Sequence, residues 1–192
     1  MSISTIILLA IIVGTVLWVV GAYNGLIGLK NQVVNGWKQI DVQLKRRHDL
    51  IPNLVNAVKG AMDFERSTLE AVISARNRAV GATGVRQTAQ AEGELTQALG
   101  RLFALTEAYP ELKATGNVTQ LQEEVTSTEN KIGFARQLYN DVATQYNTRQ
   151  MQFPTNLVAG LAKASPAELW EIEDAGDREV PVVDLSLKKP VS

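Results

Sequence analysis

The sequence contains no cysteine and only one histidine. The lack of cysteine excludes disulfides, thiolate metal sites, iron–sulfur clusters and cysteine nucleophiles. One histidine cannot build a multi-histidine metal site within a single chain. The chain also has no glycine-rich phosphate loop, no G-x-S-x-G elbow and no dinucleotide-binding fingerprint. We therefore expect neither an enzymatic activity nor a cofactor.

The net charge is close to zero, and aromatic residues are also scarce. The formal net charge is −1, which gives no general electrostatic reason to bind nucleic acid. Aromatic residues make up 6% of the chain, and Ala, Leu, Gln, Glu and Arg dominate its middle. This composition is typical of helices, and no run of residues predicts strands.

The first 29 residues carry no charged side chain, since Lys30 is the first. Residues 3–22 read ISTIILLAIIVGTVLWVVGA, and a helix of that length spans roughly 30 Å, the thickness of the hydrocarbon core. We predict a transmembrane anchor at residues 1–23, with the lipid bilayer as its partner. The predicted lipid-facing residues include Ile6, Leu8, Ile11, Val16 and Trp18.

A cleaved signal peptide is the alternative interpretation of this segment, because Val20-Gly21-Ala22 resembles a small-residue cleavage site. The five residues before Ile6 contain no base, and the apolar stretch exceeds a usual signal core, so we favour the anchor. Lys30 and Lys38 follow the span, which favours a cytoplasmic position for the rest of the chain. A periplasmic position stays open.

Apolar residues beyond the span recur at spacings of three and four, which predicts three long helices at about 33–62, 65–109 and 117–153. In the third helix the series is Leu121, Val125, Thr128, Ile132, Ala135, Tyr139, Val142 and Tyr146. We expect Pro52 to kink or break the first helix, and Gly81 and Gly84 to split or loosen the second. Helices of about forty residues reach roughly 60 Å. Such thin rods often complete their burial against copies of themselves, so we expect a homo-oligomer.

A short fourth helix is predicted from a capping box, with Ser165 as the cap, Pro166 at the first helical position and Glu168 at the third. The chain after Asp174 is predicted to be an extended or disordered tail, at residues 175–192. The predicted fold is thus all-α, with a transmembrane helix, a bundle at residues 24–174 and a tail.

Five groups of residues are candidate sites. The basic run at 45–48 could bind anionic lipid, but a helix places it about 35 Å from the bilayer, where salt screens the attraction. His48 could act as a base, and Glu123, Glu124 and Glu129 as acid/base groups or cation ligands. We favour structural roles for these groups, and core positions for Trp37, Tyr139 and Tyr146. The tail segment VPVVDL could dock on a partner as a strand, although a solvated terminus is the favoured interpretation.

Taken together, several segments of this sequence resemble the LemA family. They are residues 23–24 (YN), 44–55 (LKRRHDLIPNLV), 107–114 (EAYPELKA), 121–124 (LQEE), 128–132 (TENKI), Arg136, 139–140 (YN), 146–147 (YN) and 153–154 (FP). The resemblance extends from the anchor to about Ala159. Lys131 stands where the family often has Arg, which is a mild departure.

This resemblance implies a bacterial protein whose N-terminal membrane helix carries an antiparallel helical bundle, here three long helices and a short fourth. It implies no activity or cofactor. The recurrent polar residues are Arg46, Arg47, Asn53, Glu129, Asn130 and Asn140. Our hypothesis is that they form a buried or half-buried network that fixes helix register.

Two functions compete. The first is a non-enzymatic scaffold that assembles with itself at the bacterial inner membrane. The second is an adaptor that binds another envelope protein, such as a protease or transporter, through its bundle or its tail.

Overall fold

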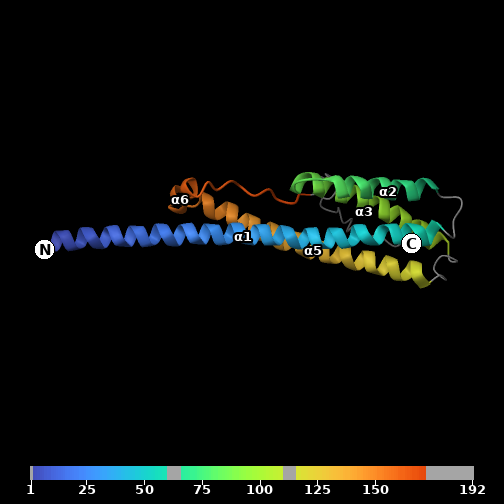
Figure 1. Ribbon diagram of the computed structural model, residues 1–192, viewed down its shortest axis with the longest axis horizontal. Coiled ribbons are helices and arrows are strands. Elements are labelled where there is room, and N and C mark those ends of the chain that lie inside the picture. Colours follow the sequence, from blue (N-terminus) through green and yellow to red (C-terminus); the bar gives the residue numbers. More distant parts are fainter. Residues whose placement is uncertain (1, 60–65, 110–115, 172–192) are drawn as a thin grey trace, which may run out of the picture.

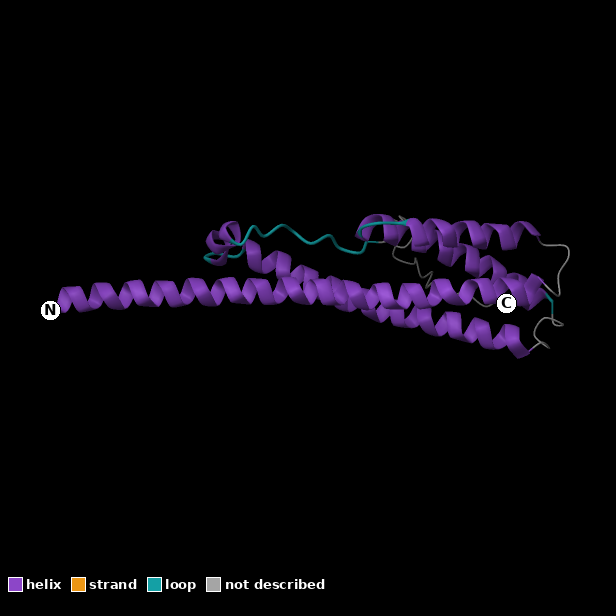
Figure 2. Ribbon diagram, viewed as in Figure 1, coloured by secondary structure: helices purple, strands orange, loops and turns teal. Residues whose placement is uncertain are grey.

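The computed structural model describes residues 2–59, 66–109 and 116–171. Every regular element in these ranges is an α-helix, which confirms the all-α prediction (Figure 2). The elements are α1 (Ile3–Lys59), α2 (Arg66–Gly81), α3 (Val85–Ala108), α5 (Gly116–Met151) and α6 (Thr155–Leu161). In Figure 1, α1 runs the length of the molecule, and its N-terminal part projects from a bundle formed by its other half and the remaining helices.

Helices α1 and α5 form the principal pair. Gly36 lies against Tyr139, and Arg47 contacts Glu129 further along, so the two helices run antiparallel. The predicted apolar series of the third helix faces this contact, and its members Val125, Thr128, Ile132, Ala135, Tyr139 and Tyr146 are all buried. The spacing of three and four places these residues on one side of α5, so the sequence pattern alone defines its packing face.

Helix α1 continues through Pro52, so the break that we expected as one alternative to a kink does not occur. A proline in a helix removes the N–H that would bond the carbonyl four residues earlier, here that of His48. In the structure Arg76 of α2 donates its Nε–H to the His48 carbonyl oxygen at 2.9 Å. The freed carbonyl therefore keeps a partner, and the exposed Pro52 ring stands on the outer side of the helix. This replacement bond allows the helix to extend to Lys59.

The second predicted helix, at 65–109, is split into two. Helix α2 ends at Gly81, and α3 begins at Val85 after Gly84, whose φ of 80° lies in the left-handed region. Glycine adopts this conformation without steric cost, which allows the chain to reverse there. The resulting α2–α3 hairpin packs along one side of the bundle half of α1 (Figure 1).

The short helix of the fold is α6 at Thr155–Leu161, and the helix predicted to start after Ser165 does not form. Residues 164–171, here called the strap, instead run as extended chain back along α5. Side chains of α5 bond the strap's peptide groups, as described below, and these bonds replace the ones that a helix would make. A local capping signal was thus outweighed by tertiary contacts. The predicted tail at 175–192 lies outside the described residues.

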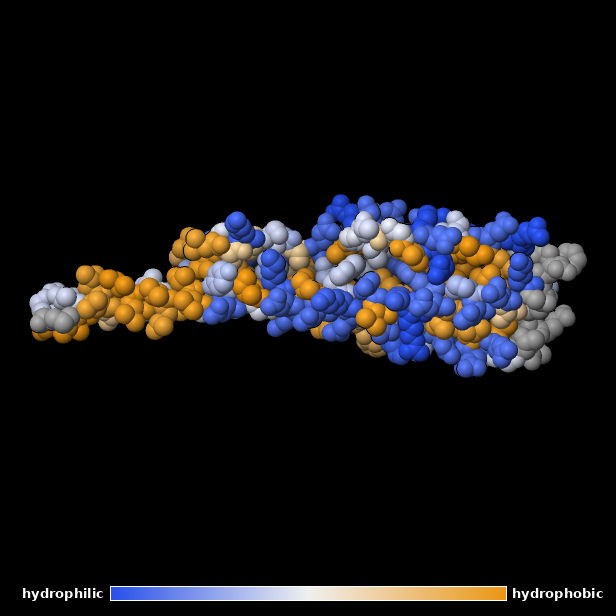
Figure 3. Space-filling model, viewed as in Figure 1, coloured by the Kyte–Doolittle hydropathy of each residue, from blue (hydrophilic) through white to orange (hydrophobic). Residues whose placement is uncertain are grey.

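The first part of α1 is apolar and uncovered. Among the residues that the structure describes, one helix is long and apolar enough to cross a membrane, and none of its most apolar window is buried. The predicted anchor residues Ile6, Leu8, Ile11, Val16 and Trp18 are 40–60% exposed. Figure 3 shows this projecting segment as a continuous hydrophobic surface. A surface of this kind is stable against lipid rather than water, as expected for a membrane anchor.

The close approach of α1 and α5 gives a testable prediction. A Cβ at Gly36 would stand 3.3 Å from the Tyr139 Cα, so Gly36→Leu should force the helices apart. Overpacking of this kind lowers the free energy of unfolding by about 1–3 kcal/mol. Gly133→Leu is the control, because a Cβ there meets nothing within 4 Å. Denaturant unfolding of the full chain in mild detergent should show a clear loss for Gly36→Leu only. Equal losses would contradict this packing.

Candidate functional site

A cluster of charged side chains lies inside the bundle, where α1, α3 and α5 meet. Arg47 of α1 is 1% exposed and forms ion pairs with Glu129 of α5 and, at 3.6 Å, with Glu92 of α3. Arg47 also donates to the Thr96 Oγ1 atom at 2.8 Å. A buried guanidinium needs both charge compensation and acceptors for its N–H groups, and this arrangement supplies both. We call Arg47, His48, Glu92, Thr96 and Glu129 the polar centre.

His48 completes the polar centre from the next position on α1. Its Nε2 atom lies 2.5 Å from Oε1 of Glu92, which is 4% exposed. Glu92 therefore stands between His48 and Arg47 and contacts both. An ionised carboxylate only accepts hydrogen bonds, so an ionised Glu92 takes an Nε2–H group as its donor in this contact. The polar centre thus joins three helices through side chains of opposite charge.

Two atoms of the polar centre have no hydrogen-bond partner among the described residues: Arg47 Nε and Glu92 Oε2. A cavity of about 210 Å³ opens beside them, and its lining includes Arg136 and Trp170 as well as Glu129. Such a cavity is large enough for ordered water, which commonly satisfies buried polar atoms.

The structure brings together only part of the polar set predicted from the sequence. Arg47 and Glu129 meet in the polar centre. Arg46, Asn53 and Asn130 are exposed, which corrects their expected place in the interior. Each of these three lies one position away from a buried or ion-paired residue, and a shift of one residue turns a helical side chain by about 100°. Asn140 belongs to a different contact, with the strap.

Two members of the polar centre, Glu92 and Thr96, were missed in the sequence, and His48 was recognised only as structural. The sequence does contain a signal for Glu92. This residue lies between Ala89 and Leu95 on the buried face of α3, where the spacing predicts an apolar side chain. A carboxylate at such a position must find a partner inside the protein. The basic run at 45–48 is divided in the same way, since Lys45 is exposed and Arg47 is buried.

A second site holds the strap against α5 through two asparagines. Asn140 accepts from the Trp170 N–H at 2.8 Å and donates to the Trp170 carbonyl at 3.0 Å. Asn147 makes the same pair of bonds to Ala167, at 2.8 and 2.9 Å. Asn140 and Asn147 are seven helical residues apart, and their partners in the strap are three extended residues apart. Both separations are about 10 Å, so each asparagine lies opposite its own peptide group. Within the strap these asparagines bond backbone groups only, and Asn147 also accepts a hydrogen bond from Gln150 of α5 at 3.1 Å.

Trp170 anchors the strap and is 4% exposed. Its ring lies 6.0 Å from that of Trp37, and the Arg136 guanidinium stands 5.5 Å from its centre, a cation–π contact. Tyr139 packs edge-on to Trp37 and donates its hydroxyl to the Glu168 carbonyl at 2.6 Å. Burial raises the pKa of Tyr139, and the Glu168 carboxylate raises it further, so the hydroxyl stays a donor at neutral pH.

The chemistry available at these sites is charge pairing and backbone recognition. Within the described ranges no group of three metal-ligating side chains occurs. Glu123 and Glu124, which the sequence raised as acid/base or cation ligands, lie outside the polar centre, and Glu124 accepts from Gln120 at 3.4 Å. Tyr139 and Tyr146 are buried and Trp37 is partly buried, which agrees with the favoured core interpretation.

Comparison with known proteins agrees with the resemblance. The model of the LemA family matches residues 36–185. Protein LemA of Metamycoplasma hominis is 29% identical over 142 residues, which cover 73% of this chain and 64% of that protein. Magnetosome protein MamQ 2 of Paramagnetospirillum magneticum is 23% identical over 184 residues, covering 82% of this chain and 68% of that protein. MamQ of Magnetospirillum gryphiswaldense is 21% identical over the same length.

The polar centre predicts a large effect for one glutamate. Glu92→Ala should lower the free energy of unfolding by about 2–4 kcal/mol, because Arg47 and His48 both lose a buried partner. Glu94→Ala, two residues along α3, is the matched control. Glu94 pairs with Arg78 while 43% exposed, so its loss should change stability by no more than about 0.5 kcal/mol. Glu129→Ala should lie between the two, since that side chain is 38% exposed. If Glu92→Ala lowers the free energy of unfolding no more than Glu94→Ala does, the polar centre does not stabilise the fold.

The bonds from Asn140 to the strap predict that its substitution releases the strap locally. Asn140→Ala deprives both Trp170 backbone groups of their partners, a loss of about 1–3 kcal/mol. Amide hydrogen exchange at Trp170 should therefore accelerate by about ten- to a hundredfold, and the exchange of α3 amides should not change. Thr144→Ala, an exposed position on α5 between the two asparagines, is the control. Unchanged exchange at Trp170 would show that the asparagine does not hold the strap.

Proposed function

The chain belongs to the LemA family, and we propose that it is a non-enzymatic, membrane-anchored helical scaffold that assembles with itself at the bacterial inner membrane. The observation that carries this proposal is an uncovered groove between α1 and α5, on the bundle that the anchor holds beside the bilayer. The chain spans 64% of the mycoplasma relative's length, so activities and partners of whole relatives are not transferred to it.

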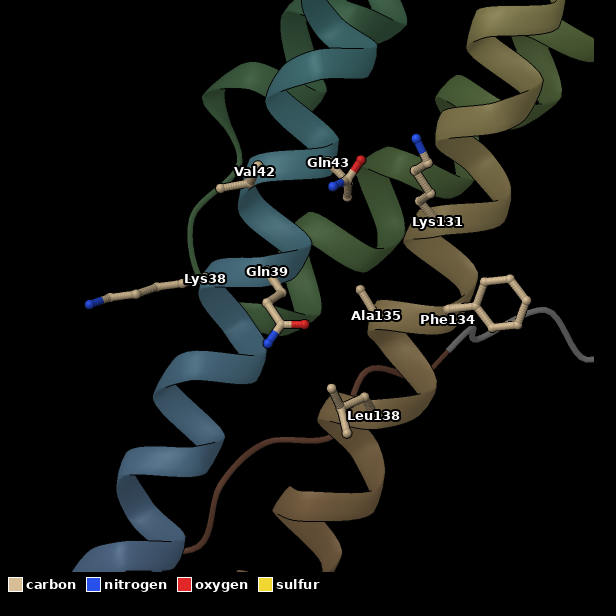
Figure 4. A pocket seen from close by; sticks show the side chains of 8 residues that line it. All are labelled: Lys38, Gln39, Val42, Gln43, Lys131, Phe134, Ala135 and Leu138. Carbon is tan, nitrogen blue, oxygen red and sulfur yellow. The ribbon is translucent and has the colours of Figure 1, made fainter.

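The groove lies on the side of the α1–α5 pair away from the strap. Figure 4 shows that α1 and α5 each supply one wall of it. The hollow measures about 460 Å³, and its lining residues are Lys38, Gln39, Val42, Gln43, Lys131, Phe134, Ala135 and Leu138. Phe134 is 74% exposed, Val42 63% and Leu138 44%, which are high values for large apolar side chains. An apolar surface of this kind on a helix pair supports a protein contact.

We assign this groove to a second copy of the same chain. Because α1 runs from the bilayer into the bundle without interruption, two copies in one membrane lie parallel. A two-fold axis that relates them runs between the copies, parallel to α1. In that arrangement α1 of each copy packs beside α5 of the other across the dimer interface. The four helices then alternate in direction, as in an up-down-up-down four-helix bundle.

The proposal includes a cytoplasmic position for the bundle. Lys30 and Lys38 follow the span closely, and the positive-inside rule places such residues in the cytoplasm. Periplasmic exposure is the alternative.

An adaptor for another envelope protein is the second candidate function. The strap favours it, because Asn140 and Asn147 hold an extended segment through its backbone alone. Such a site accepts other extended segments of similar shape. The VPVVDL tail, proposed for docking from its sequence, lies outside the described residues.

Self-assembly is tested with single cysteines, since the chain has none of its own. In native membranes, oxidation of a Leu138→Cys variant should produce a disulfide-linked dimer, because Leu138 lies near the proposed two-fold axis. Thr144→Cys, an exposed site on a different face of α5, should remain monomeric. A dimer of the Leu138→Cys variant with the mass of two chains supports the scaffold.

Two outcomes would contradict it. A monomer for both variants rules out this face, and cross-linking of Leu138→Cys to a different protein favours the adaptor. The Thr144→Cys variant also reports orientation: labelling in intact cells by a reagent that cannot cross the inner membrane would place the bundle in the periplasm.

A further inference from the structure

A second apolar surface lies where α5 turns into α6, outside all the sites described above. Its large side chains are almost fully in solvent: Met151 is 70% exposed, Phe153 80%, Leu157 65% and Leu161 75%. We call these four residues the corner. Figure 3 shows hydrophobic surface over α6, directly beside the apolar part of α1. Four such side chains gathered at one place are unusual for a surface in contact with water.

The corner stands at the level where α1 leaves the membrane. Ala159 of α6 packs with Leu26 of α1, and Leu26 is 1% exposed. Leu26 lies four residues beyond the predicted span, or about 6 Å along the helix. The antiparallel register gives the same result: Tyr139 lies against Gly36, so Met151 stands level with about residue 24. The headgroup layer on each side of a bilayer is about 5–8 Å thick, so the corner falls within it.

The charged side chains nearest the corner are bases. No acidic residue occurs in residues 1–40, nor between Asp141 and Glu168. The bases in those two segments are Lys30, Lys38, Arg149 and Lys163, and all four are exposed. The chain as a whole has a net charge of −1, so its acids are concentrated in the rest of the molecule. Exposed bases beside an apolar surface match the anionic headgroups and acyl boundary of a bacterial membrane.

We propose that the corner inserts into the interface of the bilayer that α1 crosses, as a second membrane contact. Met151, Phe153, Leu157 and Leu161 enter the acyl boundary, and Arg149 and Lys163 lie among lipid phosphates. With α1 as the first contact and the corner as the second, rotation and tilt of the rod relative to the membrane are both restricted. This inference rests on the membrane anchor of the proposed function. It does not depend on self-assembly.

Site-specific fluorescence in vesicles tests the insertion. The full chain with Leu157→Cys, labelled with a small fluorophore, is reconstituted into vesicles of phosphatidylethanolamine and phosphatidylglycerol. Quenching is compared between a nitroxide carried on the lipid and iodide in the water. We expect strong quenching by the lipid nitroxide and several-fold weaker quenching by iodide than at Ile73→Cys. Ile73 lies on α2 and is 43% exposed, so the protein alone would give Leu157 the faster iodide quenching.

A third variant, Ile11→Cys in the span, separates failure of the inference from failure of the anchor. If Ile11→Cys is quenched from the lipid and Leu157→Cys only from the water, the corner stands free and this inference is wrong. If Ile11→Cys is itself quenched only from the water, the anchor is wrong, and with it the proposed function. If Leu157→Cys is shielded from both quenchers, a protein surface covers the corner, and the lipid proposal is overturned.

Discussion

The structure depends on one constraint, the continuity of α1 from the apolar span to the end of the bundle. A 57-residue helix has no joint at which the soluble part could swing away from the membrane. Everything that packs on its second half therefore has a fixed height above the bilayer. The groove beside Val42, the polar centre at Arg47 and the corner at α6 take their positions from this helix. The proposed parallel packing of copies and the proposed contact of α6 with lipid both rest on the same continuity.

Two sets of contacts preserve that continuity where the sequence weakens it. Pro52 removes a backbone donor, and Arg76 of α2 supplies another to the His48 carbonyl. One turn earlier, Arg47 and His48 bring charge into the interior, where Glu92 and Glu129 compensate it. Buried ion pairs often add little net stability compared with apolar packing, but leaving one partner alone is costly. The polar centre therefore penalises a shift of α1 relative to α3 or α5, since any shift separates the charges.

Much of the helical architecture could be predicted from the sequence, because it follows from local periodicity. The span needed only a run of apolar residues, and the packing face of α5 needed only the spacing from Val125 to Tyr146. The features that escaped prediction depend on partners far along the chain. Glu92 acquires its role from His48, 44 residues earlier. The strap contains a capping box that begins at Ser165, which predicts a helix. Its extended form instead depends on Asn140 and Asn147 of α5. Pro52 failed as a helix breaker because its compensation comes from Arg76, on the helix that follows.

The most direct test of this account is the distance between two sites on α1 on either side of the membrane surface. Spin labels at Val16→Cys and Lys45→Cys, both exposed positions, can be measured in vesicles after dilution with unlabelled protein. An unbroken helix separates these positions by about 44 Å. The account predicts a single narrow distance distribution near that value. A broad distribution or a clearly shorter distance would show a joint between the anchor and the bundle, and would contradict the fixed heights on which the groove, the polar centre and the corner depend.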